Sequence, residues 1–318
     1  MADSERNTTH YKLVTYEAAQ GPRAGAVLND TVFDLAALTG KPSYATMLGV
    51  LDDWAKAEPL IEAAVAKKVE KGSGATPGSP LAKARLLAPV LYPSAIFCAG
   101  ANYSDHMAEM TRVFNLAPEP DPHKAGLTPW HFIKASRTVV QADARIPLPA
   151  RTKMLDWEAE LAAFIGRAAK NVPAERALDY VAGYTVANDL SARDFTVRPN
   201  VPESSPFRYD WISQKSFDCA CPLGPWIVPA KQIPDPQRLG IKLWVNDVLK
   251  QDSPTSKMIF SLAEQIAHLS ARLTLHPGDL ILTGTPAGVG LARKEFLKSG
   301  DVVRVWIERI GTLSNTLV

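Results

Sequence analysis

The spacing of hydrophobic and polar residues divides the first third of the chain into a few short elements. Residues 11–38 alternate apolar and polar positions between turn signals, which predicts short strands. Residues 44–69 repeat apolar positions at helical spacing and predict a helix that is interrupted near Pro59. The segment 71–80 is the richest in Gly, Ser and Pro, so it predicts a loop. Together these elements predict a small N-terminal α+β domain over residues 1–93.

The remainder of the chain, residues 94–318, alternates apolar strand-like runs with few helical patterns. The pair Asn246-Asp247 between two apolar runs predicts a hairpin turn. Ser261 and Glu264 have the spacing of a capping box, so an amphipathic helix is expected to begin there. Because strands outnumber helices, we predict an α+β fold with a mainly β core and peripheral helices.

Two long segments lack any regular apolar pattern. They are residues 111–130 and 197–209, and both are rich in proline or polar residues. Loops of this length in a compact domain are usually lids, binding loops or disordered segments. We interpret both as lids, and we expect the first to become ordered when a ligand binds.

Two carboxylates, Glu158 and Glu160, lie two residues apart within the apolar run 155–166. Alternate residues of a strand face the same side, so both side chains are expected to point together. Asp189 follows the apolar run 180–187, where a strand that ends in a loop can bring a third carboxylate to the pair. Such a cluster favours a bound cation, and oxygen ligands suit Mg²⁺, with Mn²⁺ or Ca²⁺ next. The alternative is a solvated face of an edge strand.

A histidine and a glutamate are spaced to share one helix face. His106 and Glu109 lie at i and i+3 in SDHMAEM, with Ser104 or Asp105 as the expected N-cap. A carboxylate in this position can orient an imidazole and raise its basicity, so that the pair draws a proton from water. Without further context the same spacing is also typical of a solvated helix.

Composition excludes several classes of function. Lys and Arg number 35 against 33 Asp and Glu, and no long block of either sign occurs, so we expect no nucleic-acid partner. No apolar run reaches the length of a membrane helix, and the N-terminus lacks the apolar core of a signal peptide, so we expect no membrane association and a cytoplasmic location. The three cysteines, Cys98, Cys219 and Cys221, are expected to be buried thiols.

From Ala99 onward, an ordered set of motifs resembles the fumarylacetoacetate hydrolase family. Together the motifs span most of the last two thirds of the chain in the family's order. They are AGANYSDHMAE (99–109), FIKAS (132–136), DWEAELAAFIG (156–166), VAGYTVANDLSARD (181–194), QKSFDCACPLGPWIV (214–228), VNDVLKQ (245–251), PGDLILTGTPAGVG (277–290) and GDVVRVWIERIGTLSN (300–315).

The resemblance implies a fold, a metal site and a catalytic pair. It implies a catalytic β-roll domain over residues 94–318, with Mg²⁺ held by a Glu-x-Glu motif and an aspartate. The matching metal ligands are Glu158, Glu160 and Asp189. It also implies that His106 and Glu109 act from a mobile lid, and that the protein is a homodimer.

Further cationic and polar positions match substrate-contacting residues of the family. Lys215, in SQKSFD, matches a catalytic lysine that stabilises a developing enolate oxygen. Substrate-binding roles are implied for Arg193, Thr285 and Lys134, the last with a structural alternative in which it closes a loop over the pocket. Three positions depart from the family pattern and bear on substrate choice, namely Thr196, Gln214 and Ala135.

The glycine-rich segment TGTPAGVG does not fit a nucleotide-binding loop. Gly284, Gly288 and Gly290 lack the G-x-G-x-x-G spacing, and no Gly-Lys-Ser/Thr follows. We therefore expect a tight turn at the pocket wall and no nucleotide cofactor.

The resemblance implies a Mg²⁺-dependent hydrolase that cleaves a C–C bond of a β-diketo acid of the acylpyruvate or fumarylpyruvate type. In this hypothesis the substrate is a small-molecule 2-oxo acid, and the His106–Glu109 pair activates the water that attacks it. Cleavage of the C–C bond then releases a pyruvate-like enolate. An oxaloacetate-type decarboxylase and a hydratase or isomerase of 2-oxo-enoic acids are the alternatives, because the same enolate serves them. A non-catalytic metal-binding protein is a further alternative.

Overall fold

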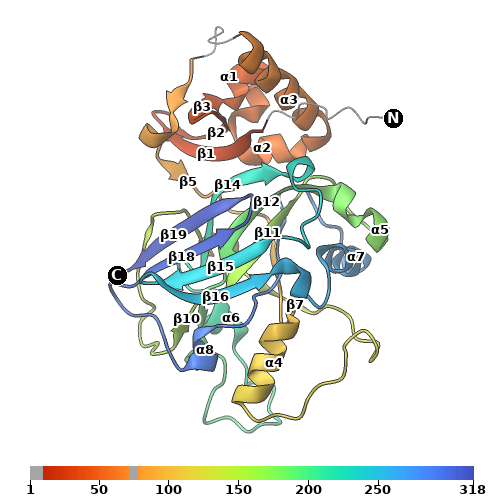
Figure 1. The fold of residues 1–318 in the computed structure, drawn as a ribbon, viewed down its shortest axis with the longest axis vertical. Coiled ribbons are helices and arrows are strands. Elements are labelled where there is room, and N and C mark those ends of the chain that lie inside the picture. Colours follow the sequence, from red (N-terminus) through yellow and green to blue (C-terminus); the bar gives the residue numbers. More distant parts are fainter. Residues whose placement is uncertain (1–9, 72–76) are drawn as a thin grey trace.

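A long mixed sheet runs through both predicted domains. The computed structural model describes residues 10–71 and 77–318. Within them the sheet follows the order β4-β3-β2-β1-β14-β12-β11-β17-β6-β7, with β5 beside β1 and β8 beside β14. Figure 1 shows the N-terminal strands and helices at one end of the molecule and the central strands below them. The two parts join where Leu13 of β1 pairs with Ile227 of β14.

The strands and helices have the following bounds. The strands of the long sheet are β1 (Lys12–Ala18), β2 (Gly21–Leu28), β3 (Thr31–Asp34), β4 (Ser79–Pro80), β5 (Leu86–Leu87), β6 (Ile96–Ala99), β7 (His131–Lys134), β8 (Val139–Val140), β11 (Ala159–Ile165), β12 (Val181–Asn188), β14 (Cys221–Pro229) and β17 (Leu280–Leu282). The other strands are β9 (Arg145–Ile146), β10 (Leu155–Asp156), β13 (Ser191–Ala192), β15 (Gly240–Val245), β16 (Val248–Pro254), β18 (Val302–Ile307) and β19 (Gly311–Leu317). The α-helices are α1 (Leu35–Thr39), α2 (Met47–Asp52), α3 (Trp54–Lys71), α4 (Ser104–Val113), α5 (Ala174–Ala177), α6 (Trp211–Lys215), α7 (Leu262–Arg272) and α8 (Gly290–Arg293). The 3₁₀ turns are η1 (Pro42–Ala45), η2 (Leu81–Lys83), η3 (Ser136–Thr138), η4 (Leu178–Tyr180), η5 (Arg193–Phe195), η6 (Ala230–Gln232) and η7 (Thr255–Lys257).

The N-terminal unit has the predicted strands, but its helix is interrupted elsewhere than predicted. The break falls at Asp53, between α2 and α3, and Pro59 lies inside α3. Asp53 leaves the helical region at φ −112° and ψ 25°, and its carboxylate accepts a hydrogen bond from the Tyr44 hydroxyl. Pro59 removes one backbone donor near the start of α3, and the helix continues past it. Of the predicted loop 71–80, residues 72–76 lie outside the described part.

A second sheet packs against the central strands. Its order is β16-β15-β18-β19-β9, and inward and outward residues alternate along β15 and β18. The predicted hairpin is confirmed, since Asn246 and Asp247 join β15 to β16 with φ of 49° and 66°. Both values suit a two-residue turn of the type that matches strand twist.

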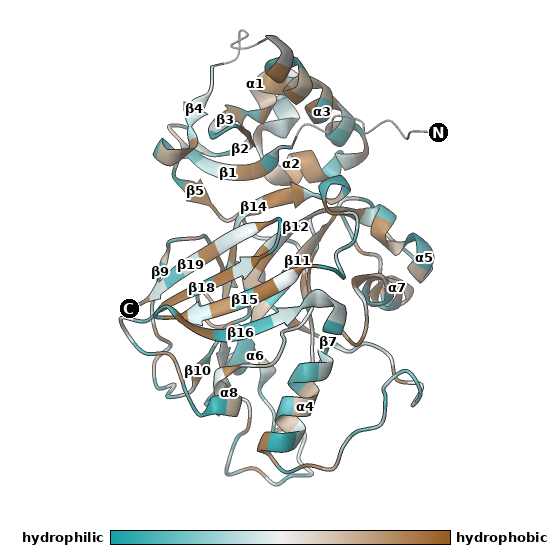
Figure 2. Cartoon of the chain, viewed as in Figure 1, coloured by the Kyte–Doolittle hydropathy of each residue, from teal (hydrophilic) through white to brown (hydrophobic). Residues whose placement is uncertain are grey.

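The core of the larger unit lies between these two sheets. Every residue of β11 and of β12 is buried, and side chains such as Leu161, Leu243 and Val305 share one apolar cluster. Figure 2 shows hydrophobic residues on the central strands and a mixture of hydrophilic and hydrophobic residues on α4. The predicted helix after Ser261 is confirmed as α7, with both hydrogen bonds of its capping box. The α+β fold with a strand-rich core is therefore as predicted.

The irregular segments differ slightly from their predicted limits. Residues 111–113 continue α4, and turns and irregular backbone follow as far as residue 130. The second segment is closed at its base by an isolated bridge between Val197 and Tyr209. No described helix has the length and apolar composition required to cross a membrane.

Candidate active site

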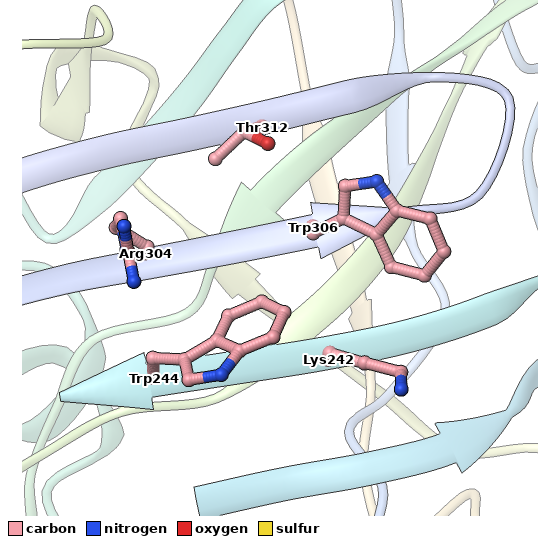
Figure 3. Close-up of a pocket in the computed structure, with 5 residues that line it drawn as sticks. All are labelled: Lys242, Trp244, Arg304, Trp306 and Thr312. Carbon is pink, nitrogen blue, oxygen red and sulfur yellow. The ribbon is translucent and has the colours of Figure 1, made fainter. Parts of the chain in front are cut away.

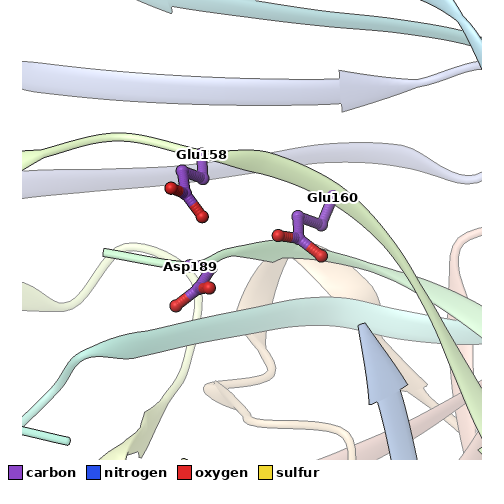
Figure 4. Close-up of side chains that lie close together, drawn as sticks. All are labelled: Glu158, Glu160 and Asp189. Atoms are coloured by element: carbon purple, nitrogen blue, oxygen red, sulfur yellow. The ribbon is translucent and has the colours of Figure 1, made fainter. Parts of the chain in front are cut away.

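Three buried carboxylates meet where β11 begins and β12 ends. One oxygen from each of Glu158, Glu160 and Asp189 lies within 4.8 Å of the others, and Figure 4 shows the three side chains converging. The register that pairs Glu160 with Ala187 places the end of β12 beside the glutamates. The structure thus brings together the three residues that the spacing predicted, in the interior and not on a solvated edge.

The backbone at Glu158 differs from the predicted uninterrupted strand. Trp157 and Glu158 separate β10 from β11. There the backbone N–H of Glu158 donates to the side chain of Asn188 at 3.0 Å, and the Trp157 indole donates to the carbonyl of Gly288 at 3.1 Å. These tertiary hydrogen bonds replace strand pairing, and both carboxylates nevertheless face the same site.

Three cations surround the carboxylates on one side. Lys215 Nζ lies 2.8 Å from Glu158 and 2.7 Å from Asp189. Lys134 Nζ donates to Asp189 at 2.5 Å and to the carbonyl of Leu190 at 3.2 Å. Lys134 does not line the cavity next to these carboxylates. The structure therefore supports a structural role for Lys134 and not a contact with substrate.

Arg193 binds carboxylates of the protein itself. Its guanidinium lies 2.5 Å from Glu158 and 2.9 Å from Asp156, a buried carboxylate that sequence reasoning missed. Asp156 also accepts hydrogen bonds from the backbone of Gly290 and Leu291, so it connects Arg193 to the start of α8. Arg193 lines the cavity, but in this conformation its guanidinium already binds the carboxylates of Glu158 and Asp156.

The carboxylates of this cluster differ in how much nearby positive charge balances them. Burial raises the pKa of Glu160 well above its ordinary value, and the charges of Asp189 and Glu158 raise it further. Burial also acts to raise the pKa of Glu158, but the charges of Lys215 and Arg193 outweigh it and hold that pKa below its ordinary value. Glu160 forms no ion pair among the described residues and accepts one backbone hydrogen bond, from Gly284 at 2.6 Å.

A divalent cation fits this arrangement. Four buried carboxylates, Asp156 included, face three cations, which leaves one formal negative charge. A divalent ion beside Glu160 would reverse that sign and make the site attractive to an organic anion. The all-oxygen donor set suits a hard ion such as Mg²⁺ or Mn²⁺.

Helix α4 carries the predicted catalytic pair over the cavity. His106 lines the cavity with Nδ1 enclosed and without a hydrogen-bond partner. Burial lowers the pKa of His106 to about 4, against the opposing charge of Glu158. Glu109 accepts a hydrogen bond from the backbone of Gly288 at 2.7 Å, so no hydrogen bond joins the pair in this conformation of the described residues.

The N-terminus of α4 is held differently from the prediction. Tyr103 is the N-cap residue and forms no side-chain cap, so neither Ser104 nor Asp105 has that role. Asp105 instead accepts hydrogen bonds from its neighbour's backbone N–H at 2.9 Å and from Ser253 at 2.6 Å. This contact to β16 was beyond sequence reasoning, because the two residues are far apart in the chain.

The cavity between α4 and the carboxylates is small and partly aromatic. Its volume is about 210 Å³, below the roughly 300–1,000 Å³ of common ligand sites, which indicates a small ligand. Thr285 lines it as predicted and accepts a hydrogen bond from Gln251 at 2.9 Å. The aromatic wall, missed from the sequence, consists of Trp130, Phe132 and Trp211.

A larger hollow lies elsewhere, on the exposed face of the second sheet. Figure 3 shows Trp244 and Trp306 there, flanked by Lys242 and Arg304. Its volume is about 410 Å³. Both cations already pair with neighbouring aspartates, and no carboxylate lines this hollow. This hollow therefore lacks the carboxylates that could hold a metal ion, whereas Glu158 and Glu160 line the smaller cavity.

The fold of this chain is shared with known proteins. The sequence profile of the family described as fumarylacetoacetate (FAA) hydrolase C-terminal matches residues 95–318. The mitochondrial oxaloacetate tautomerase fahd2 of Xenopus laevis is 43% identical over 235 residues, covering 73% of this chain and 68% of that protein.

Two solved structures resemble the chain over nearly its whole length. Maleylpyruvate hydrolase from Sphingobium sp. SYK-6, in complex with manganese(II) and pyruvate, is 30% identical with a TM-score of 0.72, covering 96% of this chain and 98% of that one. Fumarylacetoacetate hydrolase from Exiguobacterium antarcticum is 31% identical with a TM-score of 0.75, covering 96% and 99%.

Fold and site together define a strand-rich enzyme class with a buried, metal-compatible carboxylate cluster. The chain belongs to the fumarylacetoacetate hydrolase family.

Proposed function

We propose that this protein is a divalent-metal-dependent enzyme that acts on a small 2-oxo acid through its enolate. Glu158, Glu160 and Asp189 would hold Mg²⁺ or Mn²⁺. When bound, the ion supplies Lewis-acid polarisation of the 2-oxo group and compensates developing negative charge. Glu160 is a buried carboxylate without an ion-pair partner among the described residues, which supports the proposal, and so does the manganese in the related maleylpyruvate hydrolase structure.

Residues of the chain account for the remaining requirements of enolate formation. Lys215 carries a fixed positive charge at the cavity wall, where it stabilises the enolate oxygen by a few kcal/mol, roughly the effect of one preorganised donor. His106 offers a nitrogen without a partner and moves the proton at the carbon next to the 2-oxo group. The aromatic wall and α4 exclude water from the enolate.

The reaction that we favour is keto–enol tautomerisation of the 2-oxo acid. It requires one proton-transferring group and no attacking water. The observation that carries this choice is that His106 faces the cavity while Glu109 is bound to Gly288. The likeness to an oxaloacetate tautomerase supports the same reaction.

Hydrolysis of a C–C bond in an acylpyruvate is the second candidate. It requires an activated water, and Glu109, one turn along α4 from His106, is spaced to orient the imidazole if it leaves Gly288. The likeness to maleylpyruvate hydrolase supports this candidate. Oxaloacetate decarboxylation and hydration or isomerisation of 2-oxo-enoic acids use the same enolate and stay as alternatives.

Proton NMR in deuterium oxide separates these reactions. Oxaloacetate and acetylpyruvate are incubated with the protein and Mg²⁺ or Mn²⁺, and deuterium uptake at C3 is followed beside product signals. Tautomerisation predicts metal-dependent uptake faster than any cleavage, whereas hydrolysis predicts pyruvate and acetate. If neither uptake nor cleavage exceeds the rate with metal alone, the proposal is wrong.

A further inference from the structure

Gln214 is a buried polar residue of the cavity with an unmet hydrogen-bonding requirement. It lies on α6, is 3% exposed, and lines the cavity beside Lys215. Its Oε1 atom is buried and has no hydrogen-bond partner. An unpaired buried carbonyl oxygen is costly, so such atoms in native proteins nearly always have a hydrogen-bond partner, from the protein, from ordered water or from a ligand. No donor of the described residues reaches Oε1 and Gln214 lines the cavity, so its partner comes from the cavity's contents, a water or a ligand.

The surroundings of Gln214 are aromatic. Trp211 lies three residues earlier on the same helix, which places both side chains on one face. Trp211 contacts Phe132 and Trp130, with ring centroids 5.7 Å apart in each pair. Trp130 and Trp211 are each about half exposed, so this cluster forms the mouth of the cavity. Gln214 therefore lines the same small cavity as these three rings, on the helix that carries Trp211.

No uncommitted cation lines the cavity in the described residues. Arg193 and Lys215 are its two cationic lining residues, and each is within 2.9 Å of two carboxylates. If the substrate carried a second carboxylate at its far end, that group would meet the acceptor oxygen of Gln214 and aromatic rings. An amide that turned its Nε2 toward that carboxylate would offer only neutral donors, a weak replacement for a guanidinium or ammonium group.

We propose that Gln214, with Trp130, Phe132 and Trp211, forms a subsite for the far end of the substrate that accepts an uncharged group with an O–H donor. This inference rests on the proposed function. It narrows the substrate to 2-oxo acids with an uncharged far end, such as 2,4-dioxo acids, whose enol hydroxyl can donate to Gln214. Dicarboxylic 2-oxo acids such as oxaloacetate fit this subsite less well.

The test compares three substrates in the wild type and in Gln214→Met, which keeps length but removes the hydrogen bond. Acetylpyruvate has the uncharged far end, oxaloacetate has a carboxylate there, and pyruvate has neither. We expect wild-type kcat/KM for C3 exchange to be at least tenfold higher for acetylpyruvate than for oxaloacetate. Gln214→Met should lower the acetylpyruvate value about tenfold and leave pyruvate unchanged, whereas Gln232→Met, a buried glutamine outside the cavity, should change neither.

Equal losses for acetylpyruvate and pyruvate, or a wild-type preference for oxaloacetate, would overturn the subsite. Binding measured by quenching of tryptophan fluorescence distinguishes this failure from failure of the proposed function. If no substrate reacts but acetylpyruvate binds about tenfold more weakly to Gln214→Met than to wild type, the reaction is wrong and the subsite stands. Where Gln214→Met fails to fold, Gln214→Glu replaces it and should further weaken oxaloacetate binding relative to acetylpyruvate.

Discussion

Helix α4 is held over the cavity by polar contacts, and Asp105→Ala tests their contribution. No residue of α4 is fully buried, so the helix has little apolar anchorage of its own. Asp105 accepts a hydrogen bond from Ser253 at 2.6 Å and pairs with Lys257 at 3.2 Å. Removing this carboxylate should leave α4 folded but less firmly docked, with His106 more often away from the carboxylates.

The contacts of Asp105 to Ser253 and Lys257 determine how much docking free energy α4 should lose. A hydrogen bond to a charged group contributes about 1.5–3 kcal/mol, and the half-exposed Lys257 adds at most about 1 kcal/mol. We therefore expect the docked state of α4 to lose about 2–3 kcal/mol. Since 1.4 kcal/mol corresponds to a factor of ten, local opening should become roughly 30- to 150-fold more frequent.

Hydrogen exchange across residues 104–113 measures this opening. Asp105→Ala should exchange roughly 30- to 150-fold faster there, and oxalate with Mg²⁺ should slow exchange in both proteins by closing α4. Arg112→Ala is the matched control, because this side chain lies on the same helix and forms no ion pair in the described structure. Unchanged exchange in Asp105→Ala would show that α4 is docked by other contacts.

Two further perturbations test the electrostatics. Lys215→Met leaves Glu158 and Asp189 with one cation fewer, so the metal-free protein should lose about 3–5 kcal/mol of unfolding free energy. Mn²⁺ should restore more stability to the variant than it adds to the wild type. Equal gains of the two proteins in thermal denaturation would contradict this. Asp34 caps α1 and binds Arg23; burial acts to raise the pKa of Asp34, but these hydrogen bonds hold it below its ordinary value. Its stabilisation is therefore present above its ordinary pKa and lost as pH falls through the lowered value. Asp34→Ala should cost about 1 kcal/mol in urea unfolding at pH 7 and less at a pH below the ordinary pKa. An equal cost at both pH values would refute that assignment.

Features set by local chemistry could be predicted from the sequence. The turn at Asn246 and Asp247 and the capping box at Ser261 follow from neighbouring residues alone, and the structure has both. The break at Asp53 could not be predicted, because it depends on a contact to Tyr44, whereas a proline near a helix start removes only one hydrogen bond.

The carboxylate cluster was predictable because its members lie at the ends of adjacent strands. Residue spacing places Glu158 and Glu160 together, and strand pairing brings Asp189 to them. The groups that set its charge and shape come from distant segments, as Lys134 and Gln214 show, and residue spacing alone does not link them to the cluster. Their roles become visible only through burial and hydrogen bonding in the folded chain.

The central claim is that the carboxylate cluster binds a divalent cation, and calorimetric titration of Mn²⁺ and Mg²⁺ tests it most directly. Glu160→Gln removes one ligand charge, and it should remain folded because burial already favours the neutral form of this side chain. Glu17→Gln, at an exposed ion pair with Arg85, is the control. We predict one ion per chain in the wild type and in Glu17→Gln, and none in a folded Glu160→Gln. Binding of equal affinity in all three proteins would contradict the account.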